Sequence, residues 1–398
     1  MAPLSGIRVL DLTNVLAGPF CGHQLVHMGA EVIKVEAPGR GDLARDLGPD
    51  PELNARGMGT SFLAQNAGKK SVTINLKHPQ GKDLLKRMAA KADVLIENFR
   101  PGVMDRLDLG WEVLREVNSR LVYAAISGFG QDGPWRDRPA YDQIIQGASG
   151  VMSITGDAKS APLRVGYPIA DTIGGLTAAF AVAAALNARE TKGGTFIDVS
   201  MLEAVLATMG WAVSNWLISG VAPEPKGNEN VTASPSATFK TAEGLLNISA
   251  NKQEQWEVLC GHLGCPELVD QSEFVTRDDR IANRYALRAA LERHLAAKTA
   301  TAWADELSAL GVPAGAVLTV PEVLAHQQIA DRGFLETFSE VPRVDQEVKI
   351  VRTGVKLDGV SPRVATPPPT LGQHTSEVLA KLGLTEAEIA ALSDEGAI

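Results

Sequence analysis

The chain has 398 residues, of which 45% are hydrophobic and 21% are charged. This composition is typical of a globular protein with a large core and excludes a disordered or fibrous chain, and the length predicts two or three domains. The formal net charge is -9 and the basic residues are scattered among acidic ones. We therefore expect no nucleic-acid partner.

The sequence also gives no sign of a membrane segment or a secretory leader. The longest nearly apolar stretch, Gly174 to Leu186, is shorter than the roughly 20 residues that a membrane-spanning helix needs. The cysteines Cys21, Cys260 and Cys265 lack the Cys-x-x-Cys spacing of a zinc knuckle and are odd in number, so we expect no disulfide framework. These features indicate a cytoplasmic protein.

In the first half of the chain, short β-branched runs alternate with helical patterns. The predicted strands are Ile7 to Leu12, Glu31 to Glu36, Asp93 to Glu97 and Leu121 to Ser127, and the predicted helices between them are Gly18 to Met28 and Pro79 to Ala92. This alternation is typical of βαβ units, so we predict an α/β fold with a parallel sheet.

The middle of the chain predicts more core helices and then a boundary. An Ala-rich helix is expected at Ile173 to Ala188, a strand at Phe196 to Ser200 and an apolar helix at Met201 to Leu217. Residues 221–236 are rich in Pro, Asn, Glu and Gly and predict a linker. We therefore divide the chain into the N-terminal part of a large domain at 1–220, this linker, a small domain at 237–332, and a return linker with the C-terminal part of the large domain at 333–398.

The small domain and the tail carry their own elements. A hairpin is predicted at Ala237 to Thr241 and Leu245 to Ala250, which makes this an α+β domain. The remaining predicted helices are Gln253 to Leu263, Arg284 to Ala297, Thr301 to Leu310, Ser376 to Leu382 and Glu386 to Leu392.

Two motifs invite functions that their surroundings disfavour. Gly128, Gly130 and Gly133 have the spacing of a dinucleotide-binding loop, but Pro134 follows where the phosphate-binding helix should run. His23 and His27 are spaced four apart without the Glu of a zincin motif, so we expect packing and no metal site.

The segment Pro168 to Gly175 combines an acidic residue with glycines. Asp171 stands just ahead of the predicted apolar helix, and Gly174 and Gly175 permit a close backbone approach. From the residues alone, Asp171 is most simply a helix N-cap. A reactive carboxylate at the same position is the alternative.

The sequence resembles the class III coenzyme A transferases in six stretches that run nearly end to end. The first three are Leu4 to Leu12 with Ala17-Gly18-Pro19, Gly29 to Glu36, and Glu97 to Gly102. The others are Ser127 to Gln131 with Gly133-Pro134, Tyr167 to Asp171, and Leu371 to Thr375. The resemblance implies a large Rossmann-like domain, a smaller α+β domain and an interlocked homodimer.

By this resemblance, Asp171 is the nucleophile. It attacks the thioester of an acyl-CoA donor, and the exchange proceeds through mixed anhydrides and an aspartyl-CoA thioester. We expect the helix N-terminus to keep Asp171 ionised at neutral pH, and backbone NH groups near Gly174 and Gly175 to hold the developing oxyanion.

The matching family positions also imply a coenzyme A site. These positions are Val15, Leu16, Ala17, Asn98, Phe99 and Arg106, with Arg106 as a phosphate clamp. In the absence of the resemblance they would be loop, turn and core residues and a solvated charge. Coenzyme A thioesters are then substrates, and no permanently bound cofactor is expected.

Departures from the family pattern bear on the substrate. Leu16 stands where formyl-CoA transferase has Gln, and 249–253 lacks its glycine run, so a longer dicarboxylate such as succinate, malate, itaconate or glutarate is favoured over oxalate and formate. Tyr141 and Lys252 are candidates for the substrate pocket. The alternatives are a formyl-CoA:oxalate-type transferase, a non-catalytic protein that binds coenzyme A esters, and a 2-methylacyl-CoA racemase, which Tyr141 disfavours because it replaces the racemase histidine.

Overall fold

In the computed structural model, which describes residues 2–398, the chain forms two compact units. The first comprises the residues up to Val151, Arg164–Ala222 and Gln327–Ile398, and the second comprises Met152–Leu163 and Pro223–His326. The segment Met152–Leu163, which we placed in the large domain, thus belongs to the second unit. Its Gly156 carbonyl accepts a hydrogen bond of 2.7 Å from the Gly227 amide.

The predicted linker at 221–236 is largely part of the second unit. Arginine side chains bind its backbone: Arg280 donates to the Ser234 carbonyl over 3.0 Å, and Arg284 donates to the Asn230 carbonyl over 2.9 Å. The absence of periodicity in this segment reflects an irregular backbone that side chains of the unit hold in place.

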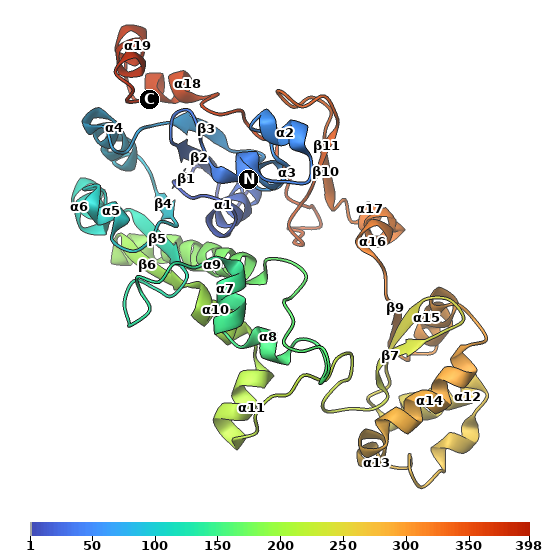
Figure 1. Ribbon diagram of the computed structural model, residues 1–398. Helices are drawn as coiled ribbons and strands as arrows, with labels where there is room; N and C mark the ends of the chain where they lie inside the picture. Colours follow the sequence, from blue (N-terminus) through green and yellow to red (C-terminus); the bar gives the residue numbers. More distant parts are fainter. Residues whose placement is uncertain (1) are drawn as a thin grey trace. The chain divides into compact units, whose positions relative to one another are not determined.

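A six-stranded parallel sheet forms the centre of the first unit (Figure 1). Its strands are β1 (Arg8–Asp11), β2 (Glu31–Glu36), β3 (Lys70–Thr73), β4 (Val94–Glu97), β5 (Val122–Ser127) and β6 (Thr195–Ser200). They are ordered β3-β2-β1-β4-β5-β6, and every neighbouring pair is parallel. In such a doubly wound sheet, the strand order reverses between β1 and β4, and ligands bind at the carboxyl ends there.

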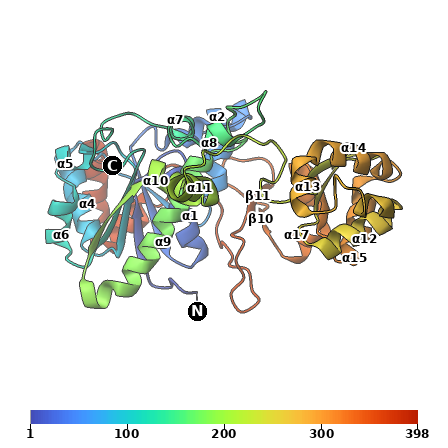
Figure 2. The ribbon, with the colours of Figure 1, turned by 90° about the horizontal axis from the view of Figure 1, so that it is seen from below.

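Helices cover both faces of this sheet (Figure 2). Val9 and Val94 pack in the core toward one face, while the next residues, Leu10 and Leu95, pack toward the other. Successive side chains of a strand point to opposite faces, so strands covered on both sides read as continuous apolar runs. One face carries α1 (Ala17–His27), α9 (Ile169–Lys192) and α10 (Met201–Thr208), and the other α4 (Pro79–Ala89), α5 (Val103–Arg106) and α6 (Trp111–Val117).

Two helices differ from their predictions. α9 has 24 residues and begins at Ile169, before the predicted start. By length and composition it could cross a membrane, but in this unit it packs against α1, α10 and the sheet. The predicted helix Met201 to Leu217 is broken into α10 and α11 (Trp211–Ser219), which meet at an angle of 80°. Gly210 has φ +51° at this bend, a backbone conformation that favours glycine.

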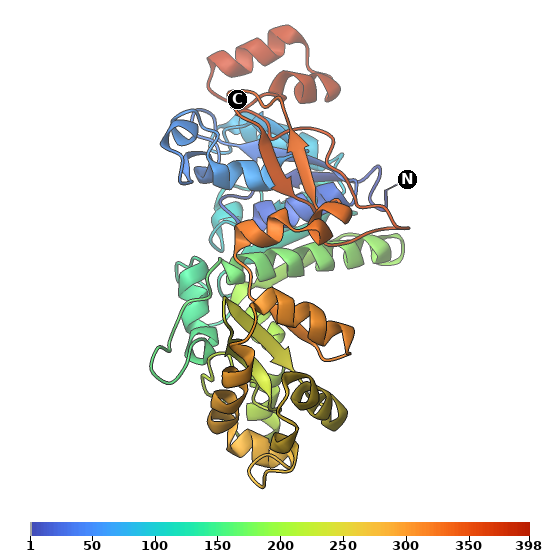
Figure 3. The ribbon, with the colours of Figure 1, turned by 90° about the vertical axis from the view of Figure 1, so that its right-hand side faces the viewer.

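The C-terminal part of the chain returns to the first unit, where its orange and red segments lie beside the blue N-terminal elements (Figure 3). It packs beside β3, the edge strand of the sheet. The amide of His374 donates to the Ser71 carbonyl over 2.9 Å, and the amide of Thr73 donates to Oγ1 of Thr375 over 3.0 Å. Its elements are α17 (Gln327–Asp331), the antiparallel pair β10 (Leu335–Phe338) and β11 (Val348–Val351), α18 (Thr375–Lys381) and α19 (Glu386–Asp394).

Shorter helices complete the first unit, and the second unit has a core of its own. The additional helices of the first unit are η1 (Leu43–Asp46), α2 (Pro51–Ala55), α3 (Thr60–Asn66) and α7 (Asp142–Ala148), and α8 (Val151–Ile154) spans the boundary between the units. The second unit has an antiparallel sheet of β7 (Ser236–Lys240), β8 (Leu245–Ser249) and β9 (Ala314–Ala316). Its helices are α12 (Gln253–Leu263), η2 (Pro266–Val269), α13 (Arg277–Ala282), α14 (Arg284–Leu295), α15 (Ala300–Ala309) and α16 (Val320–Ala325).

Candidate active site

A cavity of about 320 Å³ opens at the carboxyl ends of the central strands of the first unit. The loop after β1 contributes Asn14 to Ala17, and the loop after β4 contributes Asn98 and Phe99. Its wall is completed by Leu43, Ile126, Ser127, Gly128, Ala140, Tyr141, Asp171 and Met201. The cavity therefore lies where the strand order reverses, the position at which this sheet topology binds ligands.

Asp171 reaches this cavity from the first turn of α9. The helix begins at Ile169, so Asp171 is its third residue and not its N-cap. Gly175 lies one turn later on the same face, where a Cβ atom would come within 2.3 Å of the Ala17 carbonyl oxygen. This close packing of α9 on α1 brings Asp171 next to the loop after β1.

The two glycines that we assigned to an oxyanion site have a packing role instead. A Cβ atom at Gly174 would lie 2.8 Å from Cγ of Met201, and Gly175 meets the backbone of Ala17. Both residues lie beyond the first turn of α9, where helix amides bond to the carbonyl groups four residues earlier. Their NH groups are therefore not free for an oxyanion, and this assignment is corrected.

Asp142, at the start of α7, fixes the beginning of α9. Its Oδ1 accepts a hydrogen bond of 2.8 Å from the Ala170 amide, and its Oδ2 accepts one of 2.7 Å from Nε2 of Gln146. Gln146 Oε1 in turn accepts from the Val165 amide over 2.9 Å. The N-cap residue Pro168 provides no side-chain cap, so a buried carboxylate from another helix takes that role.

The same carboxylate changes the acidity of its neighbour. Burial raises the pKa of Asp171 to about 7, and the negative charge of Asp142 acts in the same direction. We expected the helix N-terminus to keep Asp171 fully ionised at neutral pH, and this expectation is wrong. Desolvation, together with repulsion by Asp142, favours the protonated form of this carboxyl near neutral pH.

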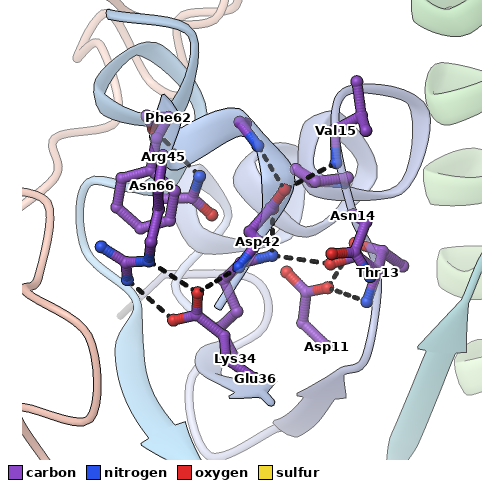
Figure 4. Close-up of polar contacts among 12 residues, drawn as sticks. Asp11, Thr13, Asn14, Val15, Lys34, Glu36, Asp42, Arg45, Phe62 and Asn66 are labelled. Carbon is purple, nitrogen blue, oxygen red and sulfur yellow. Dashed lines mark hydrogen bonds and ion pairs between the residues drawn. The ribbon is translucent and has the colours of Figure 1, made fainter. Parts of the chain in front are cut away.

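The loop after β1 is fixed in an unusual backbone conformation. Val15 has φ +67°, a left-handed value that a β-branched residue rarely adopts. Its amide donates to Oδ1 of Asp42 over 2.9 Å (Figure 4). Next to it, the amide of Asn14 donates to Oδ1 of Asn98 over 2.8 Å, and Nδ2 of Asn98 donates back to the Asn14 carbonyl over 2.8 Å. The loops after β1 and β4 are thus bonded to each other.

The second of these loops rests on a buried acid. Glu97, the last residue of β4, accepts a hydrogen bond of 2.8 Å from the Phe99 amide. Burial, with a smaller contribution from Asp105, raises the pKa of Glu97 to about 8. Sequence patterning treated Glu97 as the end of a strand and did not distinguish it from a surface acid.

Some of the predicted site residues line the cavity and others do not. Val15, Leu16, Ala17, Asn98, Phe99, Tyr141 and Asp171 line the one cavity. Arg106 is exposed on α5 and does not line it. A Cβ atom at Gly102 would lie 3.2 Å from Nη1 of Arg106 and 3.7 Å from Nη2 of Arg136, so these two guanidinium groups are neighbours. Lys252 precedes α12 in the second unit.

Two further features bear on binding. A separate cavity of about 270 Å³ is lined by Arg40, Arg45 and Arg56 together with Arg343 from the C-terminal part of the chain, and these residues form no recognisable motif. His23 and His27 pack edge to face with ring centres 4.3 Å apart. In the part of the chain that the structure describes, no three or more His, Cys, Asp or Glu side chains are grouped as for a metal ion.

Comparison with known proteins identifies relatives along nearly the whole chain. The model of CoA-transferase family III matches residues 4–375. The chain is 41% identical over 350 residues to the acetyl-CoA:oxalate CoA-transferase of Acetobacter aceti, covering 87% of this chain and 89% of that protein. It is 36% identical over 380 residues to the succinyl-CoA:glutarate CoA-transferase of Mus musculus, covering 95% and 86%. A CAIB/BAIF family protein from Brucella suis has a similar structure, with a TM-score of 0.85 and 34% identity over 96% of this chain and 99% of that one.

Proposed function

The chain belongs to CoA-transferase family III, and we propose that it moves coenzyme A from an acyl-CoA donor to a dicarboxylate through an aspartyl-CoA thioester on Asp171. The observation that carries this proposal is the position of Asp171, an acid in the wall of a cavity at the switch point of the sheet. In residues 2–398 its carboxylate has no hydrogen-bond partner, so it is available to react.

The exchange is written as four nucleophilic steps. The Asp171 carboxylate attacks the thioester carbonyl, which forms a mixed anhydride and releases the coenzyme A thiolate. The thiolate attacks the Asp171 carbonyl of the anhydride, which releases the donor acid and leaves the aspartyl-CoA thioester. The acceptor carboxylate then attacks this thioester, and the thiolate it displaces attacks the acceptor carbonyl of the new anhydride, so that Asp171 is regenerated.

The environment of Asp171 fits a nucleophile. A carboxylate with a pKa near 7 is more basic than one in water, so its attack on a carbonyl is more favourable. Asp142 holds the start of α9 through the Ala170 amide and therefore fixes Asp171 relative to the cavity. The rigid loops of Asn14 to Ala17 and of Asn98 and Phe99 form the wall that would receive the thioester end of coenzyme A.

Cationic groups supply the charges that coenzyme A and a second carboxylate require. Arg106 and its neighbour Arg136 provide a guanidinium pair for phosphate groups. Arg164 lies 3.5 Å from Oδ2 of Asp142, the residue that holds the start of α9, and is half exposed, so we propose it as a cation for the far carboxylate of an acceptor. We retain Tyr141 in the substrate pocket because it lines the cavity. The role of Lys252 in substrate binding stays a prediction from the sequence.

Oxalate is a second candidate acceptor besides longer dicarboxylates. The relative named as acetyl-CoA:oxalate CoA-transferase is 41% identical, whereas those named for glutarate are 35 to 36% identical. Leu16 and the segment 249–253 still differ from the formyl-CoA transferase pattern, as noted from the sequence. We therefore favour dicarboxylates as a class, with oxalate its shortest member.

We also propose a homodimer with interlocked subunits that works in the cytoplasm. Large apolar side chains of α9 and α11 are exposed in the single chain: Phe180 by 75%, Trp211 by 81% and Ile218 by 85%. An apolar surface of this kind is typical of a face that another subunit covers. Sedimentation that gives only a monomer at micromolar concentration would contradict the dimer.

The activity is tested by mass spectrometry of coenzyme A esters. Wild type and Asp171→Ala are mixed with succinyl-CoA or acetyl-CoA and with oxalate, succinate, glutarate or itaconate. New esters formed by wild type alone support the transferase and name its acceptors. Deuterium uptake into a 2-methylacyl-CoA without exchange would support the racemase, and binding of coenzyme A esters with neither reaction would support a non-catalytic protein.

A further inference from the structure

The strained backbone at Val15 is held by a buried ion pair that has no other contact with the cavity. Asp42 lies in the loop before η1 and accepts hydrogen bonds from the amides of Val15 and Ala44, each over 2.9 Å. Its Oδ2 lies 2.8 Å from Nζ of Lys34, and both side chains are 0% exposed. Lys34 is part of β2, a central strand, so the pair is anchored to the sheet.

The cations of this network also bind the carbonyl groups on either side of Val15. Nζ of Lys34 donates to the Thr13 carbonyl over 2.8 Å, and Nζ of Lys69 donates to the Pro19 carbonyl over 2.9 Å. Lys69 in turn pairs with Asp11 over 2.8 Å. The backbone from Thr13 to Pro19 is therefore held at both ends and in the middle by charges that water does not reach. Figure 4 shows the part of this network around Thr13, Val15, Lys34 and Asp42.

A second group of buried charges fixes Asp42 itself. The Asp42 amide donates to Oε2 of Glu36 over 2.9 Å. Both oxygens of Glu36 are bound by Arg45, with Nε and Nη2 at 2.7 and 2.8 Å. This bidentate pairing leaves Glu36 little freedom and therefore fixes the position of the Asp42 amide that binds to it.

Stability alone does not account for such an arrangement. Burying ion pairs removes charges from water, and replacing them by apolar residues is often neutral or stabilising. A β-branched residue with left-handed φ is also unfavourable and persists only where its surroundings impose it. Both features are found at the segment that lines the cavity beside Asp171.

We propose that Asp42, supported by Lys34, is a positioning residue that imposes the left-handed conformation of Val15 and thereby shapes the backbone that receives coenzyme A, an inference that rests on the proposed function of this cavity. Asp42 does not line the cavity and acts through Val15. Loss of its carboxylate lets Val15 relax to negative φ and moves the Asn14 to Ala17 wall.

A double-mutant cycle with free coenzyme A as the probe tests this. Titration calorimetry is carried out with wild type, Asp42→Ala, Val15→Gly and the double variant, at a temperature where circular dichroism shows each to be folded. Asp42→Ala should weaken binding by about tenfold when Val15 is present. In the Val15→Gly background the loss should be about threefold or less, because glycine adopts positive φ without help.

Controls separate positioning from general stability. Glu336→Ala removes another buried carboxylate of the first unit, which pairs with Arg352 over 2.8 Å and does not line the cavity. It should lower the melting temperature and leave the Kd for coenzyme A unchanged. If Asp42→Ala does not fold, Asp42→Asn is used in the same cycle, since the amide keeps an acceptor for Val15 but loses the ion pair, with smaller losses expected.

The outcomes distinguish this inference from the proposed function. Two results would overturn the positioning role: a wild-type Kd in Asp42→Ala, or a loss of affinity that is the same with Val15 present as in the Val15→Gly background. Either result, with coenzyme A binding by wild type, leaves the transferase standing. Absence of coenzyme A binding by wild type would overturn the proposed function and this inference with it.

Discussion

The two sides of the cavity are built in opposite ways. On one side, the backbone of Thr13 to Val15 is bonded by Lys34, Asp42 and Asn98. On the other side, Asp171 has no hydrogen-bond partner in the described residues 2–398 and faces the like charge of Asp142. The backbone of the binding wall is thus hydrogen-bonded and rigid. The ionised carboxylate of Asp171 is energetically unfavourable in the folded protein, and reaction with the thioester removes its charge.

The largest expected effect is the loss of exchange when Asp171 is replaced. Asp171→Asn keeps the shape of the side chain but removes the nucleophile, so we expect exchange to fall by at least about a thousandfold. Rates are measured by chromatography of the coenzyme A esters. Residual exchange within tenfold of wild type would mean that another group carries the acyl transfer.

The same substitution should stabilise the fold above neutral pH. The pKa of Asp171 is raised from 3.8 to about 7, so wild type loses stability as the pH rises through this interval. An amide has no such penalty, and the gain in the free energy of unfolding should reach about 2 to 4 kcal/mol at pH 8. Below pH 4 the two proteins should be equally stable.

Urea unfolding at pH 4, 6 and 8 measures this difference. The exposed Asp137, replaced by Asn, is the matched control and should show no growing gain with pH. A gain for Asp171→Asn that is equal at all three values would show that the carboxylate is not unfavourable in the folded protein.

A smaller effect is expected when a cationic side chain proposed to bind coenzyme A is removed. Arg106→Ala should weaken coenzyme A binding by roughly 1.5 to 3 kcal/mol, the usual range for a hydrogen bond to a charged group. Arg115→Ala removes an exposed guanidinium that pairs with Glu112 in α6 and should leave the Kd unchanged. Calorimetric titration gives both values, and equal Kd values for the two variants would remove Arg106 from the site.

The smallest effect concerns the charge that faces Asp171. Asp142→Asn keeps an acceptor for the Ala170 amide but removes the repulsion, so the pKa of Asp171 should fall. The acid limb of the kcat/KM profile, expected near pH 7 in wild type, should then move to lower pH. An acid limb that stays in place would show that burial alone sets the acidity of Asp171.

The sheet was largely predictable, and its exceptions have physical causes. β2 was predicted with its observed bounds, and β1, β4 and β5 within one residue at each end, because strands covered on both faces are nearly continuous apolar runs. β3 was missed because Lys70 to Thr73 contains a single apolar residue, Val72. The side chains of Lys70 and Thr73 bond to Glu377 and Thr375 of the C-terminal segment, which a local pattern cannot show.

The site was predictable in part, and only through resemblance. The residues alone favoured an N-cap at Asp171, and the structure gives the capping role to Asp142, a contact between α7 and α9 that no spacing reveals. Gly174 and Gly175 were correctly identified as positions that need glycine, but the reason was wrong. Close packing of helices requires the missing side chain here, and not the approach of a ligand. The buried charges that hold Val15 were not predicted, because a single charged residue in a strand does not indicate which residue it pairs with.

The central claim, that Asp171 carries coenzyme A covalently, is tested most directly by mass spectrometry of the intact protein after incubation with succinyl-CoA or acetyl-CoA and no added acceptor. The account predicts a coenzyme A adduct that peptide mapping places on Asp171, that hydroxylamine removes, and that Asp171→Asn does not form. Exchange by wild type without any adduct on Asp171, or with the adduct on another residue, would contradict it.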